Sequence, residues 1–573
     1  MERPRTPTPD PVGDPTSAFP EIGTGQQELI AAAMPRLTVA ELSAAARYGC
    51  LEQVQAGDVL FDIGDPSGDL LVCETATLEA LRTPADEFPA QTFMRYGPGQ
   101  FAGELNHLTG QRRALAVWVA TAGTVYRLSA DGFRRLMAQE VELSDVFLRA
   151  FLARRRLLRY GGGQPLHLVG DPASATGMAL RTYLARQGLP FQWHTAPAED
   201  PHTATLTADD LPAAVLGRTV LRQVTPALLG DHLNLTYGEP DEELVDLAVV
   251  GAGPGGLAAA VYGASEGLRT VLLDAVATGG QAATSARIEN YLGFPFGVSG
   301  ADLAARAAVQ ALKFGVRIAS PCRVSGLDSG AGEHVLSLAD GTRIRSRCVI
   351  VATGAEYRAL PLAGWRELTG RGIYYAATDL EAQAVQGRPV VVVGGANSAG
   401  QAALHLARYA SSVDLVVRGG ELGARMSAYL VDRVEADPRI TVRLRTEVAE
   451  LHGTHDLEAV TLATAGVVAA QPLPCKGLFC FIGARPATSW LPETARDAAG
   501  FLLTDRQLTA DADGGAWTGA ERAPLPYETS LPGVFAVGDV RADSMKRVAA
   551  AVGEGASAVR SVHQYLALTP ARA

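Results

Sequence analysis

The chain has 573 residues, 47% of them hydrophobic and 19% charged, a composition typical of a folded globular protein with about three to five domains. The formal net charge of −11 is spread along the chain without a basic run, which argues against nucleic acid as a partner. No apolar stretch reaches about 18 residues without a charge or a turn signal, and the 6 cysteines are few, so we expect a cytoplasmic protein without a membrane span.

Residues 1–18 are rich in proline and polar side chains and lack the apolar core of a secretory signal, so the sequence predicts a disordered tail. Residues 19–158 then show short β runs separated by turns, followed by helical segments. The stretch from Gly97 to Ala120 resembles the phosphate-binding cassette of cyclic-nucleotide-binding domains. The resemblance implies that Gly103 and Glu104 hold a ribose 2′-OH and that Arg113 pairs with the cyclic phosphate.

This cassette departs from the pattern in two places. Ala114 stands where a Ser or Thr hydroxyl would bind the phosphate, and the glycine expected in the middle strands is absent from CETATLEAL. The sequence therefore predicts a cyclic-nucleotide-binding-like β-roll with a cyclic nucleotide as a candidate ligand. The alternative is a degenerate cassette that serves docking or dimerisation.

Three glycines, Gly161 to Gly163, form a predicted linker to a further segment, residues 164–238. Its pattern of strand, helix, strand and then Leu211-Pro212 before another strand resembles a thioredoxin or glutaredoxin-like fold. No cysteine occurs between Cys73 and Cys322, so this segment cannot perform thiol chemistry. We expect a structural or protein-binding role for it.

A dinucleotide-binding fingerprint lies between Val249 and Asp274. An apolar run leads into Gly251-Ala-Gly253-Pro-Gly-Gly256, a helix of small residues follows, and a second apolar run ends on the acid Asp274. Gly251 permits the tight turn, Gly253 lets backbone N–H groups approach a pyrophosphate, and Gly256 lets the helix pack on the strand. Asp274 can accept hydrogen bonds from a ribose 2′-OH.

A second strand–turn–helix begins at Arg388, with Ala396 where the middle glycine of the turn is expected. The added methyl group crowds the pyrophosphate approach. The strand after the helix ends in Arg418 rather than an acid, and a cation there suits a 2′-phosphate, which favours NADPH over NADH. The alternative is an ordinary solvated arginine.

Three further segments follow the order of one known family: Gly279-Gly280-Gln281 with IENYLGFP, then VIVATGAEYR, and LPGVFAVGDVR near the C-terminus. With the two fingerprints they resemble the FAD-dependent pyridine-nucleotide disulfide oxidoreductases, specifically the low-molecular-weight thioredoxin reductase type. The resemblance covers about residues 244–566. It implies an α/β, three-layer ββα flavoprotein with an FAD domain at 244–358 and 483–567, split around an NADPH domain at 359–482.

The resemblance also implies which residues contact the two cofactors. For FAD they are Gly251, Gly253, Gly256, Asp274, Gly280, Gln281, Asn290, Asp539, Arg547 and Val548. For NADPH they are Gly395, Asn397, Ser398, Ala399 and Arg418. We expect a homodimer and no metal site.

The redox C-x-x-C of thioredoxin reductases is missing, because Ala376 and Asp379 occupy its two cysteine positions. Without thiols there, electrons cannot pass from reduced flavin to a local disulfide. The other close pair, Cys475 and Cys480, includes a cysteine inside an apolar strand pattern, which indicates a buried and inert thiol.

The sequence thus favours an NADPH-dependent FAD oxidoreductase with a non-dithiol acceptor, either a ferredoxin or flavodoxin-like carrier or a quinone. One alternative is a cyclic-nucleotide- or redox-sensing flavoprotein scaffold with little turnover. A second alternative is a thioredoxin reductase that relies on the remote pair Cys475 and Cys480.

Overall fold

The computed structural model describes residues 24–569 except 67, 83–90, 104–105, 114, 161–165, 173, 196–205, 217–218, 238–243, 286, 331, 510–516 and 518–521. The predicted tail at 1–18, the glycine linker and Glu104 lie outside these residues. The chain divides into two compact units. The first comprises residues 1–170, 189–224 and 232–234, and the second comprises residues 171–188, 225–231 and 235–573.

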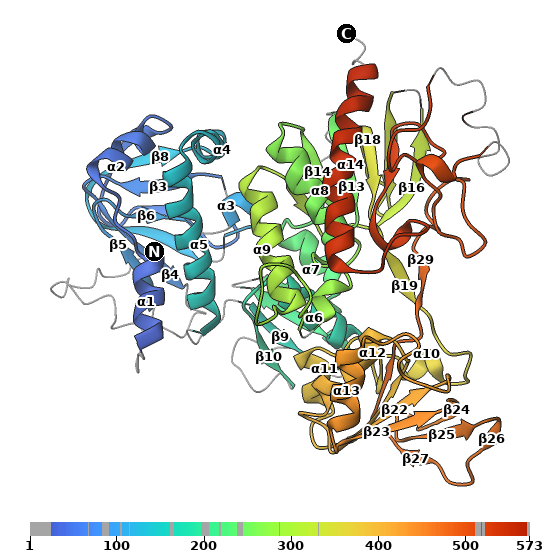
Figure 1. Cartoon of the computed structure of the whole chain (residues 1–573). Coiled ribbons are helices and arrows are strands. Elements are labelled where there is room, and N and C mark those ends of the chain that lie inside the picture. Colours follow the sequence, from blue (N-terminus) through green and yellow to red (C-terminus); the bar gives the residue numbers. More distant parts are fainter. Residues whose placement is uncertain are drawn as a thin grey trace. The chain divides into compact units, whose positions relative to one another are not determined.

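The first unit contains the predicted β-roll (blue in Figure 1). One antiparallel sheet has the order β1(Cys50–Val54), β8(Gly123–Leu128), β3(Leu70–Cys73), β6(Phe101–Ala102). The other has the order β2(Val59–Phe61), β7(Ala116–Thr121), β4(Thr77–Arg82), β5(Gln91–Tyr96). The helices of this region are α1(Thr24–Ala33), α2(Val39–Ala46), α3(Asn106–Thr109), α4(Ala130–Gln139) and α5(Val141–Tyr160).

Helices α4 and α5 pack on the roll through a cluster of aromatic side chains. Phe133, Phe147 and Phe151 are buried against Phe101 of β6, and the Phe101 and Phe147 ring centroids lie 4.4 Å apart. Burial of four such rings is a large hydrophobic contribution, since each aromatic side chain removes about 150–250 Å² from water. The roll therefore has its own core.

The predicted thioredoxin-like segment is shared between the two units. Its strands belong to the first unit, in the order β10(Gln192–His194), β9(Leu166–Val169), β11(Ala213–Leu216), β12(Thr219–Leu221). Strand β10 runs parallel to β9, and β11 runs antiparallel to it. Helix α6(Ala175–Gln187) and most of α7(Pro226–His232) belong to the second unit. The thioredoxin likeness of the segment remains a prediction.

The second unit holds two dinucleotide-binding domains. The sheet of the first has the order β15(Arg317–Ala319), β14(Thr270–Leu273), β13(Val245–Val250), β18(Arg343–Val351), β17(His334–Leu338), β16(Val324–Ser329), and β30(Val534–Ala536) pairs with β18. Helices α8(Pro254–Ser265), α9(Gly300–Lys313) and α14(Val548–Leu568) lie on one face (Figure 1). Leu247 and Val249 of β13 face these helices, whereas Ala248 and Val250 join the core of the other face. A parallel strand buried on both faces accounts for the continuous apolar run in the sequence.

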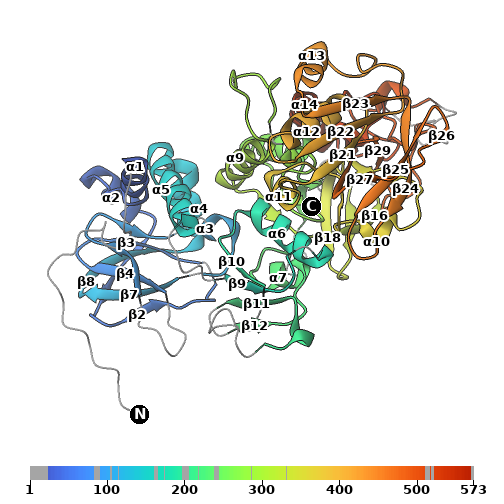
Figure 2. The same cartoon turned by 90° about the horizontal axis from the view of Figure 1, so that it is seen from below.

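The second domain contains an all-parallel sheet, β20(Ile373–Tyr374), β28(Gly477–Cys480), β21(Pro389–Val393), β22(Ser412–Val417), β23(Ile440–Leu444), flanked by α12(Asn397–Leu406) and α13(Ala428–Ala436) (Figure 2). A smaller sheet contains β24(Thr446–His452), β25(Ala459–Thr464), β26(Val467–Val468) and β27(Leu473–Pro474), and α10(Trp365–Leu368) and α11(Asp379–Ala384) precede β21.

The chain passes between these two domains through an antiparallel strand pair. Strand β19(Ala355–Tyr357) leaves the first domain and β29(Ala484–Pro486) returns to it. Strand β30 then completes the first sheet beside β18. The first domain is thus interrupted by the second, as the sequence predicted. Among the helices in the described part of the chain, none combines the length and the apolar character needed to cross a membrane.

Candidate functional site

The glycine turn after β13 opens one wall of a large cavity. Gly251 has φ of 105°, and a Cβ atom there would lie 2.3 Å from the Ala352 carbonyl oxygen, so only glycine fits. A Cβ atom on Gly256 would lie 1.8 Å from the Gly251 carbonyl oxygen, because α8 packs directly on the turn. A Cβ atom on Gly253 would instead meet only Gly280 Cα, at 4.0 Å. Gly253 therefore borders open space, with the first turn of α8 beside it.

The cavity has a volume of about 1560 Å³, above the roughly 300–1,000 Å³ typical of pockets for drug-sized ligands. It belongs to the second unit. Eight residues that the sequence assigned to FAD line it: Gly251, Gly253, Asp274, Gly280, Gln281, Asp539, Arg547 and Val548. The two others lie elsewhere, since Gly256 is buried behind the turn and Asn290 is exposed outside the cavity.

Asp274 lies at the end of β14 and holds the neighbouring loops through backbone N–H groups. Its Oδ2 accepts a hydrogen bond from Ala252 at 2.8 Å, and its Oδ1 accepts from Val276 and Ala277 at 2.9 and 3.0 Å. Burial raises the pKa of this carboxyl, and the three N–H donors oppose that shift. A carboxylate has about four acceptor positions, so Asp274 can still accept a ribose hydroxyl.

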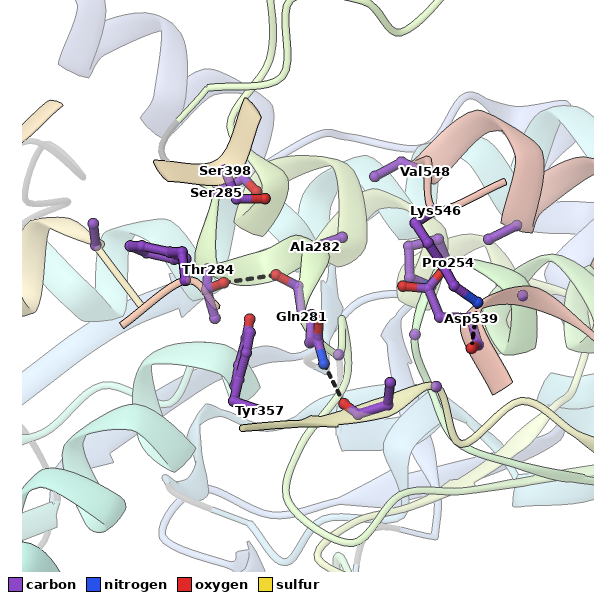
Figure 3. A pocket seen from close by; sticks show the side chains of 18 of the residues that line it. Pro254, Gln281, Ala282, Thr284, Ser285, Tyr357, Ser398, Asp539, Lys546 and Val548 are labelled. Atoms are coloured by element: carbon purple, nitrogen blue, oxygen red, sulfur yellow. Dashed lines mark hydrogen bonds between the residues drawn. The ribbon is translucent and has the colours of Figure 1, made fainter. Parts of the chain in front are cut away.

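Polar side chains follow the cavity wall after Gly280 (Figure 3). The Gln281 amide donates to the Ala355 carbonyl, and the Thr284 hydroxyl donates to the Gln281 carbonyl at 2.7 Å. Tyr357 lies across from them, stacked on Tyr375 with ring centroids 5.6 Å apart, and burial raises its pKa. This wall offers hydroxyl and amide groups beside an aromatic ring. The sequence did not single out Tyr357, because an isolated tyrosine carries no motif.

The turn that carries Asp539 is held from behind by Glu554 of α14. This buried carboxylate accepts hydrogen bonds from the Gly538 N–H at 2.7 Å and from Arg541 at 2.9 Å. Lys546 donates to the Asp539 carbonyl at 2.7 Å and lines the cavity beside it (Figure 3). Burial lowers the pKa of Lys546 and raises that of Asp539. Lys546 directly precedes Arg547, a predicted FAD contact, but sequence reasoning did not identify Lys546 itself.

One of the two positions expected for the missing dithiol borders the same cavity. Ala377 and Asp379 line it, whereas Ala376 does not, and Ala377 forms a parallel β-bridge with Ser285. The Tyr409 hydroxyl donates to Asp379 Oδ1 at 3.2 Å, and His405 Nε2 lies 3.4 Å from the same oxygen. Burial lowers the pKa of His405, and Asp379 opposes that shift. Asp379 thus forms a polar cluster with His405 of α12 and with Tyr409, at a position where the resemblance leads one to expect a thiol.

The remote cysteine pair lies outside this cavity. Cys475 and Cys480 are both buried among apolar side chains, and burial raises their thiol pKa values to about 12 and about 11. Cys322 does line the cavity, and burial raises its pKa to about 12. Among the described residues the structure therefore provides no thiol there that is poised to ionise near neutral pH.

Of the residues assigned to NADPH, only Ser398 reaches the cavity. Gly395 belongs to the turn before α12, and Ala399 belongs to the helix itself. The Asn397 amide is buried and bound to Ser427, donating at 3.0 Å to its hydroxyl and accepting at 2.7 Å from its N–H. Arg418 projects from the end of β22 with 87% of its side chain exposed, and its Nε lies 3.9 Å from a Glu447 oxygen. Its guanidinium can be reached from solvent.

The cassette of the β-roll encloses much less space. A cavity of about 20 Å³ is lined by residues that include Gly103 and Arg113, which is far too little for a nucleotide. Arg113 is only 5% exposed. Its guanidinium donates to the Asp69 carbonyl at 2.7 Å and lies 3.4 Å from the centre of the Phe61 ring. A phosphate could pair with Arg113 only after these contacts rearrange.

Known proteins resemble both parts of the chain. Residues 245–555 match the family model "Pyridine nucleotide-disulphide oxidoreductase", and residues 51–140 match "Cyclic nucleotide-binding domain". The C-terminal part is 32% identical over 321 residues to the thioredoxin reductase of Treponema pallidum, a match that covers 56% of this chain and 97% of that protein. It is 29% identical over 327 residues to a "34.2 kDa protein in rubredoxin operon" of Clostridium pasteurianum, covering 57% of this chain and 98% of that protein.

Solved structures agree with these matches. The thioredoxin reductases of Lactococcus lactis (FR conformation) and T. acidophilum each match with a TM-score of 0.50 at 27% identity. In both cases the match covers 56% of this chain and 99% of the solved chain. The predicted combination of a thioredoxin-reductase-like fold with an N-terminal cyclic-nucleotide-binding-like β-roll is confirmed.

Proposed function

The chain belongs to the pyridine nucleotide-disulphide oxidoreductase family and is an FAD-dependent oxidoreductase of thioredoxin-reductase type, and on that premise we propose that it passes electrons from NADPH to an acceptor that is not a dithiol. The observation that carries the proposal is the polar cluster of Asp379, His405 and Tyr409 where this family has its redox cysteine. Disulfide exchange needs an attacking thiolate and a second thiol to resolve it, and a carboxylate can be neither.

The cavity residues fit FAD, the cofactor of this family. Gly253 offers no side chain to cap α8, so N–H groups of the first turn are available to a diphosphate, which the helix dipole also favours. The open space at Gly253 leaves room for that group. We propose that Asp274 binds ribose hydroxyls and that Asp539 binds the ribityl chain. When bound, FAD supplies the capacity to accept a hydride from NADPH and release electrons singly or in pairs.

Rapid mixing of the oxidised protein with NADPH under anaerobic conditions tests this proposal. We expect loss of the flavin absorbance, followed by reoxidation on adding rubredoxin, ferricyanide or a quinone, and negligible turnover with thioredoxin. Rubredoxin is included because of the relative from a rubredoxin operon. Sustained thioredoxin turnover that is lost in Cys475→Ser or Cys480→Ser would contradict the proposal and support the remote pair.

We also propose that Arg418 selects NADPH over NADH, because an accessible guanidinium can pair with the 2′-phosphate. Such a charge-assisted contact is worth about 1.5–3 kcal/mol, or about ten- to a hundredfold in affinity. Arg418→Ala should remove most of the preference measured by flavin reduction rates at limiting nucleotide, while Arg371→Ala, at an exposed arginine of the same domain that does not line the cavity, should leave it unchanged. Equal rates with NADH and NADPH in the parent protein would show that Arg418 has no such role.

A cyclic nucleotide is the second candidate ligand, supported by the match of residues 51–140. Because the cassette cavity is nearly closed, we propose that binding would require Arg113 to leave the Asp69 carbonyl. Calorimetric titration with cAMP and cGMP tests this, with Arg113→Ala as the control. The homodimer and the cytoplasmic location also remain proposals, the first of which light scattering can test.

A further inference from the structure

Helix α6 contributes a side chain to the cavity although it precedes the family match at residues 245–555. The helix is sharply delimited. The Ser174 hydroxyl caps its start by accepting from the Gly177 N–H at 3.0 Å, and Gly188, with φ of 65°, ends it. It belongs to the same compact unit as the two dinucleotide-binding domains.

The last turn of α6 is anchored beside Asp274. The Tyr183 hydroxyl donates to the Ser320 carbonyl at 3.2 Å, and the Gln187 amide donates to the Ser320 hydroxyl at 2.6 Å. Ser320 directly follows β15, whose last residue, Ala319, accepts the Asp274 N–H at 3.0 Å. Two residues later, the Cys322 N–H donates to the Asp274 carbonyl at 2.6 Å. The end of α6 is therefore tied to the loop that holds Asp274.

Arg186 lies between these two anchors and lines the cavity. Positions 183, 186 and 187 share one face of a helix, so anchoring of the first and last fixes the direction of the middle one. Among the described residues, no hydrogen bond and no ion pair within 4 Å engages the Arg186 guanidinium. Burial lowers its pKa, while the charge of Asp274 opposes that shift, and arginine nevertheless stays protonated.

The position of Arg186 favours an anionic ligand. Arg186 is partly buried, and a partly buried cation is stabilised by an opposite charge and by hydrogen bonds. A guanidinium pairs with phosphate oxygens through two parallel N–H donors, and its flat face can also stack on an aromatic base. Asp274, the acid expected to bind ribose, has the largest electrostatic effect on the pKa of Arg186, ahead of Tyr357 and Glu381.

We propose that Arg186 binds the adenosine diphosphate half of the dinucleotide in this cavity, so that a helix from outside the family region completes the flavin site. This inference rests on the proposed assignment of the cavity to FAD. It adds a ligand contact from a segment that the sequence placed in a separate, thioredoxin-like domain.

The test measures binding to the full-length apoprotein rather than turnover. Flavin is removed, and the dissociation constants of FAD, FMN and ADP are determined by fluorescence and calorimetry. In Arg186→Gln we expect FAD and ADP to bind about ten- to a hundredfold more weakly, with FMN unchanged because it lacks the adenosine half. Arg186→Lys should recover part of the loss. Arg181→Gln is the matched control, because Arg181 lies on the same helix but does not line the cavity.

The outcomes separate this inference from the proposed function. If the parent protein binds no FAD, the assignment of the cavity fails. If the parent binds FAD and Arg186→Gln binds it equally well, only the role of Arg186 is overturned. Equal weakening of FAD and FMN would also overturn it, as would a matching loss in Arg181→Gln, since both would indicate disturbed packing of α6 rather than a lost contact with the adenosine diphosphate half.

Discussion

At the scale of single residues, the glycines of the first fingerprint divide into those that the backbone requires and one that the ligand requires. An added Cβ atom would lie 2.3 Å from a backbone carbonyl oxygen at Gly251 and 1.8 Å from one at Gly256. Gly253 has no such neighbour. The protein itself therefore has room for a side chain at this position, whereas the diphosphate proposed at the start of α8 would collide with one.

Gly253→Val should give a folded protein without bound flavin. The added side chain enters the cavity instead of the core, so the apoprotein should melt near the temperature of the parent apoprotein. Flavin absorbance near 450 nm checks the loss of bound flavin, and circular dichroism checks that the protein is folded and melts as expected. Gly256→Val is the contrast, because its side chain collides with the Gly251 carbonyl and should prevent folding. Yellow Gly253→Val protein would contradict the assignment.

The six cysteines should differ sharply in reactivity. Cys50 is exposed, whereas the other five are buried. The pKa values of Cys475 and Cys480, raised to about 12 and about 11, leave both as neutral thiols at pH 8, and only the thiolate reacts. A maleimide should label one thiol per native chain, at Cys50, and all six after denaturation, as counted by mass spectrometry. Rapid labelling of Cys475 or Cys480 in the native protein would support the alternative in which this pair is the redox centre.

At the scale of elements, local sequence rules predicted the parts of the site that local geometry creates. Tight glycine turns, apolar parallel strands and the start of α8 depend on neighbours within a few residues. Arg186 could not be predicted in this way, because its place depends on the path of the chain that brings α6 to Ser320. Asn290 is the opposite case. The family motif assigned this residue to FAD, but it lies outside the cavity.

We expect His107, in the short helix α3, to make the β-roll sensitive to acid. The ring nitrogens of His107 are buried, the ring packs against Phe133 and Phe151, and burial lowers its pKa to about 3 from the ordinary value of about 6.5. Between about pH 6.5 and pH 3 the unfolded chain therefore binds a proton at His107 that the folded chain does not bind. The contribution of His107 to the free energy of unfolding of the roll should be fully present above pH 6.5. It should decrease as the pH drops toward 3, by up to about 1.4 kcal/mol per pH unit.

Urea unfolding of the roll, followed at several pH values, measures this effect. His107→Gln should flatten the dependence between pH 6.5 and 4, and His455→Gln, at an exposed histidine, should not. An unchanged slope in His107→Gln would show that another group binds the proton.

At the scale of the whole molecule, the chain contains two compact units with separate cores. A ligand stabilises only the unit that binds it, by about 2.7 kcal/mol when its concentration is a hundred times the dissociation constant. Calorimetry should therefore show FAD raising the melting temperature of the second unit and leaving the transition of the β-roll in place. A single transition that shifts as a whole would show that the two units unfold together.

The pairing of β30 with β18 also fixes an order of events during synthesis on the ribosome. The nascent chain exposes β13, β14 and β18 early, but their sheet lacks β30 until nearly all of the chain has been translated. The inserted domain, between β19 and β29, has by then emerged completely and can fold by itself. A strand made late therefore completes a sheet whose other strands were made much earlier, and a ribosome that stops before residue 534 leaves an unfinished sheet edge exposed to its neighbours.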